Sequence, residues 1–458
     1  MSEELRDEEL VSDDEESGSD SEIEDTEEME TEGNGAEEQP LVRRTYIPTV
    51  VDNNEELDFD ESAYVLYRKA QTEYPCLSFD IVADRLGAGP ERADNYPLSC
   101  TLVAGTQSGK ADGNKVLVLR MSGLHQIKHK EEKEDNESDD SSDSEEEEPE
   151  PQLDCIPIEH RGCVNRIRST SVNGKCLCGT WSESGTVFLW DFTQAVEAVN
   201  DSELVNQFIK NKTSVKPIFS FSGHRVEGYG LDWSSLKPGL LATGDCRKNI
   251  FIWKPTESNA WAVDQKALIG HKESVEDLQW SPSEENVLAS CSVDQSIRIW
   301  DIRAKQSSSC MLSVESAHDS DINVISWNKT EKTFIASGGD DGVIKIWDLR
   351  QFKSKAPKPI AAFKHHISHI TSVEWHPTDG TVFAASGDDN QLTLWDLAVE
   401  KDNINDCDES EVNELPPQLL FIHQGQTEIK ELHWHKQIPG LIISTASNGI
   451  DLFRTISV

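Results

Sequence analysis

Short runs of alternating apolar and polar residues fill the chain from about residue 76 onward, and turn-forming residues separate them. Alternation with a period of two indicates half-buried β-strands. Before this region, Asp58 followed three residues later by Glu61 is typical of a helix start, and Pro75 marks the end of the pattern. The apolar residues in between share one helical face: Ala63, Leu66, Tyr67, Ala70 and Tyr74. The pattern therefore predicts one amphipathic α-helix over about 59–73, within an N-terminal segment 53–75, and an all-β region over 76–458.

An internal repeat organises the β region. A tryptophan ends an apolar-x-apolar run at intervals of 47, 47 and 48 residues, at Trp253, Trp300, Trp347 and Trp395. A histidine stands 29 residues before each of them, at His224, His271, His318 and His366. This period and these markers are typical of WD repeats, and the chain resembles a WD-repeat β-propeller. Weaker units ending at Asp191 and Phe453, and another over 99–122, bring the expected number of blades to seven.

The repeated polar residues are interpreted as structural. In each blade a buried His, Ser, Asp and Trp would form a hydrogen-bonded chain, because buried polar groups must be partnered. The residues assigned to this network are His224, His271, Ser290, Asp294, Trp300, His318, Asp341, Trp347, His366 and Trp395. Arg247 stands where the turn Asp is expected and Phe453 replaces the last Trp, so these two blades are expected to lack the full network. The last blade also lacks a fourth strand, and residues 77–82 (LSFDIV) are the expected donor.

Charge is concentrated outside this repeat. The 458 residues carry a formal net charge of -43. Residues 1–40 contain 19 acidic and 1 basic residue, and residues 131–150 contain 13 acidic and 1 basic. Low hydrophobicity and dense like charge predict a disordered tail over 1–52 and a disordered insertion over about 129–152. A weaker acidic loop covers 401–417. Four serines with acidic residues close downstream are candidate phosphorylation sites, which would add negative charge: Ser12, Ser19, Ser142 and Ser144.

This charge excludes several classes of partner. Binding to a nucleic-acid backbone needs Lys and Arg, and the same holds for an anionic membrane surface, so we expect neither partner. A basic protein is the expected partner. No apolar stretch is long enough for a membrane span, and the acidic N-terminus is not a secretory signal. The ten cysteines include no CxxC pair, which indicates reduced thiols in an intracellular protein.

A search for catalytic chemistry finds little. The sequence contains no GxSxG, HExxH or GxGxxG motif, and the segment 105–110 (GTQSGK) is one residue short of a phosphate-binding loop. Two histidine groups are conceivable metal ligands: His365, His366 and His369, and His433 with His435. Alternate residues on a strand share a face without binding anything, and His366 has its repeat position. We therefore predict a binding protein that is not an enzyme, with no cofactor and no metal.

Two local features narrow the resemblance. The segment ending in Tyr74-Pro75 and followed by CLSFDIV, and the segment from Glu409 through LPPQLLFIHQG (415–425), resemble the histone-binding WD-repeat proteins of chromatin-assembly complexes. In that family an N-terminal helix and an acidic loop ending in Pro-Pro form a groove for a basic helix. The resemblance assigns the client contacts to Asp408, Glu409, Glu411, Glu414, Pro416, Pro417 and Phe421, with Leu419, Leu420 and Ile422 as apolar floor or strand packing. Tyr64, Leu66 and Tyr67 would form the opposite wall or dock on the ring, and we favour docking.

The long acidic N-terminus and the Glu-rich insertion resemble the glutamate-rich branch of this family. That resemblance implies a nuclear and nucleolar role, and also a cytoplasmic pool, in large ribosomal subunit biogenesis. The implied activity is that of a chaperone, a monomer within larger assemblies, for a basic large-subunit ribosomal protein, with core histones as the other client. A third hypothesis is a substrate receptor of a ubiquitin ligase, because Trp-Asp-x-Arg occurs at 300–303 and 347–350.

Overall fold

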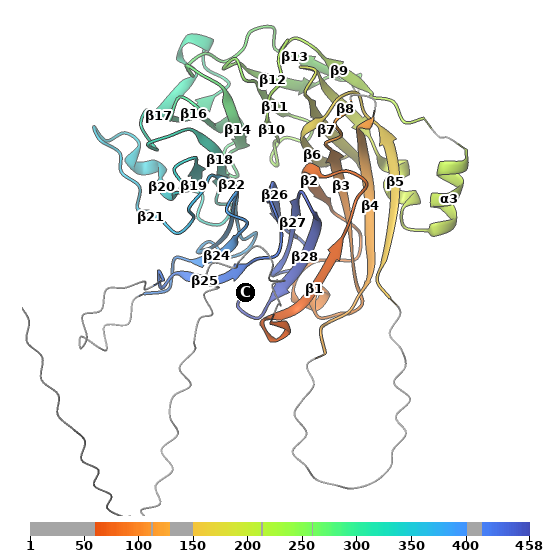
Figure 1. The fold of residues 1–458 in the computed structure, drawn as a ribbon. Helices are drawn as coiled ribbons and strands as arrows, with labels where there is room; N and C mark the ends of the chain where they lie inside the picture. The colour runs from red at the N-terminus through yellow and green to blue at the C-terminus, as the bar shows by residue number, and fades with distance from the viewer. Residues whose placement is uncertain (1–59, 111–112, 129–149, 212–213, 259, 401–414) are drawn as a thin grey trace, which may run out of the picture. The chain divides into compact units, whose positions relative to one another are not determined.

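The computed structural model describes residues 60–110, 113–128, 150–211, 214–258, 260–400 and 415–458. Within these residues the strands form seven four-stranded antiparallel sheets, each of which is one blade (Figure 1). Each innermost strand contacts the innermost strands of the neighbouring blades, and the last of them, β26, contacts β2 of the first. The compact unit over 58–458 is therefore a closed seven-bladed propeller, as predicted.

Most blades use four strands that are consecutive in sequence. Blade 1 contains β2 (Cys76–Val82), β3 (Leu98–Thr106), β4 (Lys115–Leu124) and β5 (Gln152–Glu159). Blade 2 contains β6 (Val164–Val172), β7 (Lys175–Ser182), β8 (Val187–Asp191) and β9 (Phe219–Phe221). Blade 3 contains β10 (Gly230–Trp233), β11 (Leu241–Gly244), β12 (Ile250–Pro255) and β13 (Trp261–Val263). Blade 4 contains β14 (Val275–Trp280), β15 (Val287–Ser292), β16 (Ile297–Asp301) and β17 (Cys310–Val314).

The second half of the ring follows the same order until its last blade. Blade 5 contains β18 (Ile322–Trp327), β19 (Phe334–Gly339), β20 (Ile344–Asp348) and β21 (Ala361–Phe363). Blade 6 contains β22 (Ile370–Trp375), β23 (Val382–Gly387), β24 (Leu392–Asp396) and β25 (Leu419–His423). Blade 7 contains β26 (Glu431–Trp434), β27 (Leu441–Ala446) and β28 (Gly449–Thr455), and β1 (Tyr64–Ala70) is its outermost strand. The helical segments are short: η1 (Glu61–Ala63), α1 (Pro90–Ala93), α2 (Thr193–Ala198), α3 (Ser202–Lys210), η3 (Gln306–Ser308) and η4 (Leu349–Gln351).

The predicted N-terminal helix over 59–73 is wrong. A single 3-10 turn, η1, is capped by Asp60, whose carboxylate accepts hydrogen bonds from Ser62, and the chain then runs as strand β1. Both interpretations fit the apolar positions, because a register irregularity between Tyr64 and Leu66 turns Leu66 and Tyr67 inward together. The partner strand decides between them, since β28 offers an open edge to which β1 pairs antiparallel.

The predicted donor of the closing strand is also wrong. Residues 77–82 belong to β2, the innermost strand of blade 1, and β1 closes blade 7 instead. Six of the seven residues of β2 are buried, which only a strand covered on both faces can be, whereas only three of the seven residues of β1 are buried. An inner strand needs apolar residues on both faces, and a rim strand does not.

The buried polar network forms in blades 4 and 5 as predicted. His271 Nδ1 lies 3.0 Å from Asp294 and its Nε2 lies 2.6 Å from Ser290, to which Trp300 also donates over 2.8 Å. His318, Asp341 and Trp347 repeat this geometry around Ser337. In blade 6 the histidine His366 pairs with Asp389, and Thr393 takes the place of the serine and accepts from Trp395.

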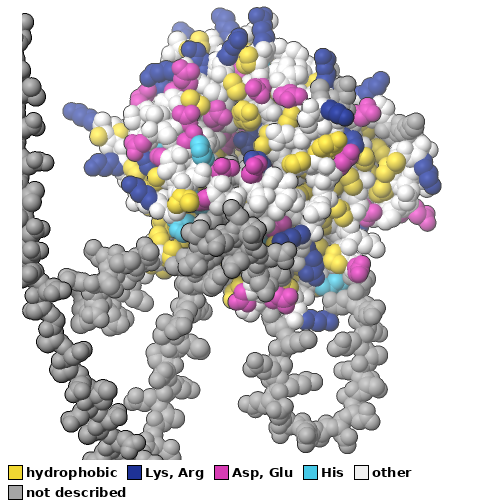
Figure 2. Space-filling model, in the orientation of Figure 1, with side chains coloured by type: hydrophobic (Ala, Val, Ile, Leu, Met, Phe, Trp, Pro, Cys, Tyr) yellow, Lys and Arg dark blue, Asp and Glu magenta, His cyan; other side chains and the backbone are white. Residues whose placement is uncertain are grey.

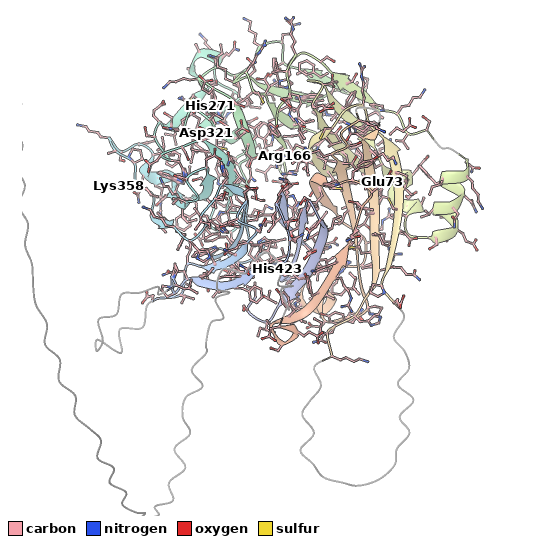
Figure 3. All side chains as sticks on the ribbon, viewed as in Figure 1. Glu73, Arg166, His271, Asp321, Lys358 and His423 are labelled. Atoms are coloured by element: carbon pink, nitrogen blue, oxygen red, sulfur yellow. The ribbon has the colours of Figure 1, made fainter. Side chains whose placement is uncertain are left out.

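Blade 3 contradicts the expectation of an incomplete network. His224 lies 2.7 Å from Asp245 and 2.7 Å from Thr243, which accepts a hydrogen bond from Trp253 over 2.9 Å. Asp245 stands two residues before Arg247 and supplies the missing carboxylate, so the full chain of contacts exists. In blade 7, where Phe453 replaces tryptophan, the Nδ1 of His423 (labelled in Figure 3) lies 2.8 Å from the hydroxyl of Tyr64 on β1. The closing strand thereby completes the network of the last blade.

Strand β1 should carry a large part of the stability of the ring. Leu66, Tyr64 and Tyr67 are 0, 5 and 7 % exposed, and losing the burial of these three side chains should cost on the order of 5 kcal/mol. We expect a chain lacking residues 1–57 to match the full chain in urea unfolding, and a chain lacking 1–70 to unfold at much lower urea. Equal midpoints for the two truncations would show that β1 does not close the ring.

Candidate functional site

The predicted client groove lies at the rim where blades 6 and 7 meet. The ring of Tyr64 on β1 packs edge-on against Phe421 on β25, with centroids 5.3 Å apart. Tyr67 donates a hydrogen bond over 2.9 Å to Asp451 on β28. Burial, followed by the charge of Asp451, raises the pKa of both tyrosine hydroxyls. Tyr64 and Tyr67 are thus internal to the seam, so the structure corrects their assignment to the client surface and agrees with the docking role.

The loop that enters β25 is described from Leu415 onward. The carbonyl of Pro416 accepts a hydrogen bond from the Leu419 amide over 2.9 Å, which forms a turn, and Pro417 at its tip is exposed. Leu419, Leu420, Phe421 and Ile422 are all half-buried. The acidic side of the groove, Asp408, Glu409, Glu411 and Glu414, lies outside the described residues and stays a prediction. The four candidate phosphorylation sites, Ser12, Ser19, Ser142 and Ser144, lie outside them as well.

Described residues near one end of each of the three acidic segments lie close to this rim. Residue 60 leads directly into η1 and β1. At the start of the insertion, Ile127 donates its amide hydrogen bond over 2.9 Å to the carbonyl of Val65 on β1. At the end of the acidic loop, Gln418 reaches back over 3.0 Å to the carbonyl of Val399. A single apolar cluster collects side chains from all of these places: Tyr64, Tyr67, Ala63, Ile127, Leu420 and Phe421.

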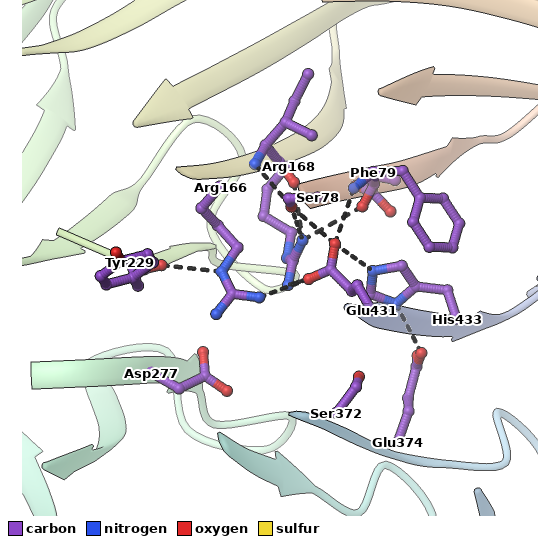
Figure 4. A network of polar contacts seen from close by, with 12 residues as sticks. Ser78, Phe79, Arg166, Arg168, Tyr229, Asp277, Ser372, Glu374, Glu431 and His433 are labelled. Atoms are coloured by element: carbon purple, nitrogen blue, oxygen red, sulfur yellow. Dashed lines mark hydrogen bonds and ion pairs between the residues drawn. The ribbon is translucent and has the colours of Figure 1, made fainter. Parts of the chain in front are cut away.

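A second polar assembly lies on the ring axis and centres on Glu431 of β26 (Figure 4). One carboxylate oxygen accepts from Arg166 over 2.6 Å and from Arg168 over 2.7 Å, both on β6. The other oxygen accepts from the hydroxyl of Ser78 over 2.7 Å and the amide of Phe79 over 2.8 Å, both on β2. Glu431 therefore connects the last blade to the first and second blades, on the axial side of the junction that closes the ring.

His433, two residues further along β26, extends this assembly to blade 6. Its Nδ1 lies 2.8 Å from Glu374 on β22 and its Nε2 lies 3.7 Å from Glu431. Burial opposes the charged imidazolium, yet the carboxylates of Glu374 and Glu431 raise the pKa of His433 to about 9. Burial also opposes ionisation of Glu431, but Arg168 and Arg166 hold its pKa well below the usual range. His433 is thus a buried cation between two anions.

Comparison with known proteins assigns the chain to a protein family. It is 45 % identical over 419 residues to "Glutamate-rich WD repeat-containing protein 1" of Dictyostelium discoideum, which covers 88 % of this chain and 83 % of the relative. The chain belongs to the glutamate-rich WD-repeat protein family. It is also 40 % identical to "Protein HEAT STRESS TOLERANT DWD 1" of Arabidopsis thaliana, over 93 % of this chain and 94 % of that protein. It is 38 % identical to "Ribosome assembly protein rrb1" of Schizosaccharomyces pombe, over 93 % and 88 %.

Two family matches fall on elements of this glutamate-rich WD-repeat protein that the structure describes. Residues 54–125 match the family described as "Histone-binding protein RBBP4", which includes a component of the CAF1 complex, and this stretch contains β1 to β4. Residues 263–301, 309–348 and 357–396 match the WD domain, G-beta repeat, and correspond to blades 4, 5 and 6. The family is a WD-repeat scaffold family and is typically non-enzymatic.

The residues considered for catalysis or metal binding have separate partners. His365 Nε2 lies 3.1 Å from Gln391, His369 lies 2.6 Å from Asp340, and His435 accepts two backbone amide hydrogen bonds. Among the residues that the structure describes, no group of three or more His, Cys, Asp or Glu is arranged to hold a metal ion. Residues 105 and 106 of the segment 105–110 belong to β3, and its other residues lie in the connection between β3 and β4. No helix in the described part of the chain is long and apolar enough to cross a membrane.

Sequence reasoning missed the Glu431 assembly. It considers His433 and His435 only as metal ligands, and it does not single out Glu431, Arg166 or Arg168. A signal does exist, because Glu431 and His433 alternate with Leu432 and Trp434 on an inner strand that should be apolar on both faces. Charged residues at every second position of such a strand indicate a face that lines the axis of the ring.

The raised pKa of His433 predicts a pH dependence of stability. The folded state stabilises the imidazolium of His433. Its contribution to the free energy of unfolding is therefore complete below the unfolded pKa of about 6.5, and it is lost as the pH rises through about 9. The loss should be on the order of 3 kcal/mol, and it should appear as a fall in the free energy of unfolding between about pH 6 and pH 9.5, measured with urea. The variant His433→Gln should show a smaller fall. A parallel pH profile for the variant would contradict this assignment.

Proposed function

We propose that this chain is a non-enzymatic acidic chaperone that binds a basic protein at the rim between blades 6 and 7. The observation that carries the proposal is the placement of the residues flanking the acidic segments around one seam. The described chain begins at residue 60 just before β1, the insertion with 13 acidic residues follows Ile127, which bonds to β1, and the loop over 401–417 leads into β25. A basic client that reaches this rim would meet negative charge from three parts of the chain at once.

The described rim has apolar surface to offer as well as nearby charge. Leu419, Leu420 and Ile422 are half-buried on the outermost strand of blade 6, and Pro417 is exposed beside them. Elsewhere on the propeller, in the view of Figure 2, acidic and basic side chains are interspersed, and Lys and Arg project from the outer rim. In the proposal, Asp408, Glu409, Glu411 and Glu414 pair with Lys or Arg of the client, while Pro416, Pro417 and Phe421 shape the apolar side. Charge steers the encounter and apolar contact holds the complex.

A large-subunit ribosomal protein is the client that we favour. One relative, similar over nearly its full length, is named a ribosome assembly protein. We accordingly place the activity in the nucleus and nucleolus during large ribosomal subunit biogenesis, with the chain acting as a monomer within larger assemblies. The match to a family described as histone-binding supports core histones as the alternative client. Both clients are basic, so the same rim would serve either.

The test is affinity purification of the full chain, followed by quantitation of the bound basic protein. The variant carries Asp408→Asn, Glu409→Gln, Glu411→Gln and Glu414→Gln. Four exposed ion pairs at about 0.2–1 kcal/mol each should sum to roughly a tenfold loss of affinity at physiological salt. The loss should shrink as salt is raised, since exposed charges are screened. Ribosomal precursor particles among the bound material would support the favoured client, and chromatin subunits the alternative.

The matched control removes the same charge from other blades. Glu257, Glu284, Glu285 and Glu331 are exposed on or beside blades 3 to 5, and their substitution by Gln should leave client binding unchanged. Equal capture by the wild type and the rim variant would overturn the assignment of the groove. Equal losses in the rim variant and in the control would show that only the net charge of the chain matters.

A second candidate function, a ubiquitin-ligase substrate receptor, is favoured by the geometry of two arginines. Arg303 and Arg350 each donate through Nε and Nη2 to an aspartate two residues earlier, Asp301 and Asp348, at 2.6 to 2.9 Å. Their side chains are 64 and 69 % exposed. The two guanidinium groups are therefore held in one orientation on adjacent blades, where a partner could contact both.

This second function predicts binding of a cullin adaptor protein that depends on both arginines. The double variant Arg303→Ala, Arg350→Ala should lose co-purification of the adaptor, whereas Arg247→Ala, an exposed arginine in blade 3, should retain it. An adaptor that is absent from the wild-type purification, or equally present with the double variant, would remove this candidate. Client capture measured on the same samples keeps the two functions separate.

A further inference from the structure

Two neighbouring blades have basic connections at one end of the ring. The connection between the third and fourth strands covers residues 302–309 in blade 4 and 349–360 in blade 5, and the structure describes both in full. Neither contains an acidic residue, although the whole chain has 85 acidic and 42 basic residues. The two connections contain six basic residues, all of them exposed: Arg303, Lys305, Arg350, Lys353, Lys355 and Lys358.

The same connection is acidic in other blades. The strand order is the same in all seven blades, so the connections between third and fourth strands lie at one end of the ring. This connection contains the Glu-rich insertion in blade 1 and the acidic loop in blade 6. In Figure 2, Lys and Arg side chains project from the edge of the ring where Figure 1 shows β17 and β21, and Figure 3 labels Lys358 there. Charge of opposite sign is thus placed in different blades.

The basic connection of blade 5 is fixed to the ring. Its first residue, Leu349, donates its amide hydrogen bond over 2.9 Å to Thr333, and its last, Ile360, donates over 2.8 Å to Ile346. Phe352 is 4 % exposed and belongs to the apolar cluster that joins blades 4 and 5. The lysines after Phe352 therefore stand on an anchored loop, and less backbone ordering is needed when they bind a partner.

The arginines and the lysines of these connections differ in what surrounds them. The aspartate two residues before each arginine raises the pKa of Arg303 and of Arg350, and Glu284 and Glu331 raise them further. Carboxylates thus already balance much of the charge of the two guanidinium groups. The excess positive charge of the two connections comes from the lysines: Lys305, Lys353, Lys355 and Lys358.

The composition of these connections favours a nucleic-acid backbone over a folded protein as the partner. Ile360, at 44 %, is the one exposed large apolar side chain in them, whereas a protein interface needs an apolar centre. Phosphate groups need only cations, which lysines supply as mobile point charges. The one aromatic residue, Phe352, is buried, so no exposed ring is present to stack on bases. Binding should therefore be independent of base sequence.

We propose that the connections 302–309 and 349–360 bind the phosphate backbone of RNA, chiefly through their four lysines. The net charge of the chain disfavours nucleic acid, but at physiological salt exposed charges act over only about 8 Å, so the local charge decides. The choice of RNA rests on the proposed role in ribosomal subunit biogenesis. The turn at Pro416 and Pro417 belongs to the equivalent connection of blade 6, so RNA and basic client would bind at the same end of the ring.

Fluorescence anisotropy of a labelled uridine oligonucleotide, titrated with the full chain between about 50 and 200 mM sodium chloride, tests the proposal. Four lysine contacts should give a plot of log K against log salt with a slope of about -3, at about 0.7 for each phosphate of a single strand. The variant Lys353→Gln, Lys355→Gln, Lys358→Gln should bind roughly tenfold more weakly or worse at the lower salt, and its slope should be smaller by about 2. Circular dichroism of each variant checks that the ring has folded.

The matched control removes the same charge from the opposite end of the ring. Arg247, Lys266 and Lys364 are exposed in connections at that end, and their substitution by Gln should leave the affinity and the slope unchanged. Capture of the basic client should be the same for both variants, which separates failure of this proposal from failure of client binding.

Four results would overturn the proposal. RNA that does not bind the wild type would leave the expectation from net charge standing. An unchanged slope in the folded lysine variant would place the RNA elsewhere on the chain. Equal losses in the variant and the control would show that only net charge matters. Displacement of the oligonucleotide by polyglutamate at a lower concentration of charge than by unlabelled RNA would assign these connections to an acidic protein.

Discussion

Closure of the ring is the constraint on which the rest of this structure depends. A four-stranded blade has two apolar faces, and only its neighbours can cover them, so the array is stable only when the last blade meets the first. Here two sets of contacts close the ring, one at the outer rim and one near the axis. At the rim, β1 pairs with β28 and its tyrosines reach His423 and Asp451. At the axis, Glu431 ties β26 to β2 and β6. Both contacts join residues at least 265 positions apart in sequence.

The strands near this closure also bear on the function that we propose. The strands that close the ring also fix where the acidic segments leave the propeller, because η1, the turn after Pro416 and the contact of Ile127 with Val65 are all built against β1 or β25. A basic client bound at this rim would lie against β1, the N-terminal strand that completes the last blade.

Sequence alone predicted the number of blades and most of the buried polar network, because both depend on a local repeat read at fixed spacing. It was wrong about β1, since Tyr64, Leu66, Tyr67 and Ala70 fit a helical period as well as a strand with an irregular register, and the deciding partner is β28. It also missed Asp245, which serves blade 3 from a position shifted by two residues. At the candidate site, the Pro-Pro turn and Phe421 could be located, but the burial of Tyr64 and Tyr67 and the role of Glu431 follow from contacts across the seam that no local pattern encodes.

The pairing of β1 with β28 has a consequence for how the protein is made. Strand β1 leaves the ribosome more than 370 residues before the strand that it pairs with, so during synthesis its apolar side chains have no native partner while six blades form. Contacts of such high sequence separation slow folding and prolong the exposure of an unpaired strand to other chains. A protein that we propose as a chaperone for a basic client would thus itself pass through a long interval during synthesis in which its first strand is unpaired.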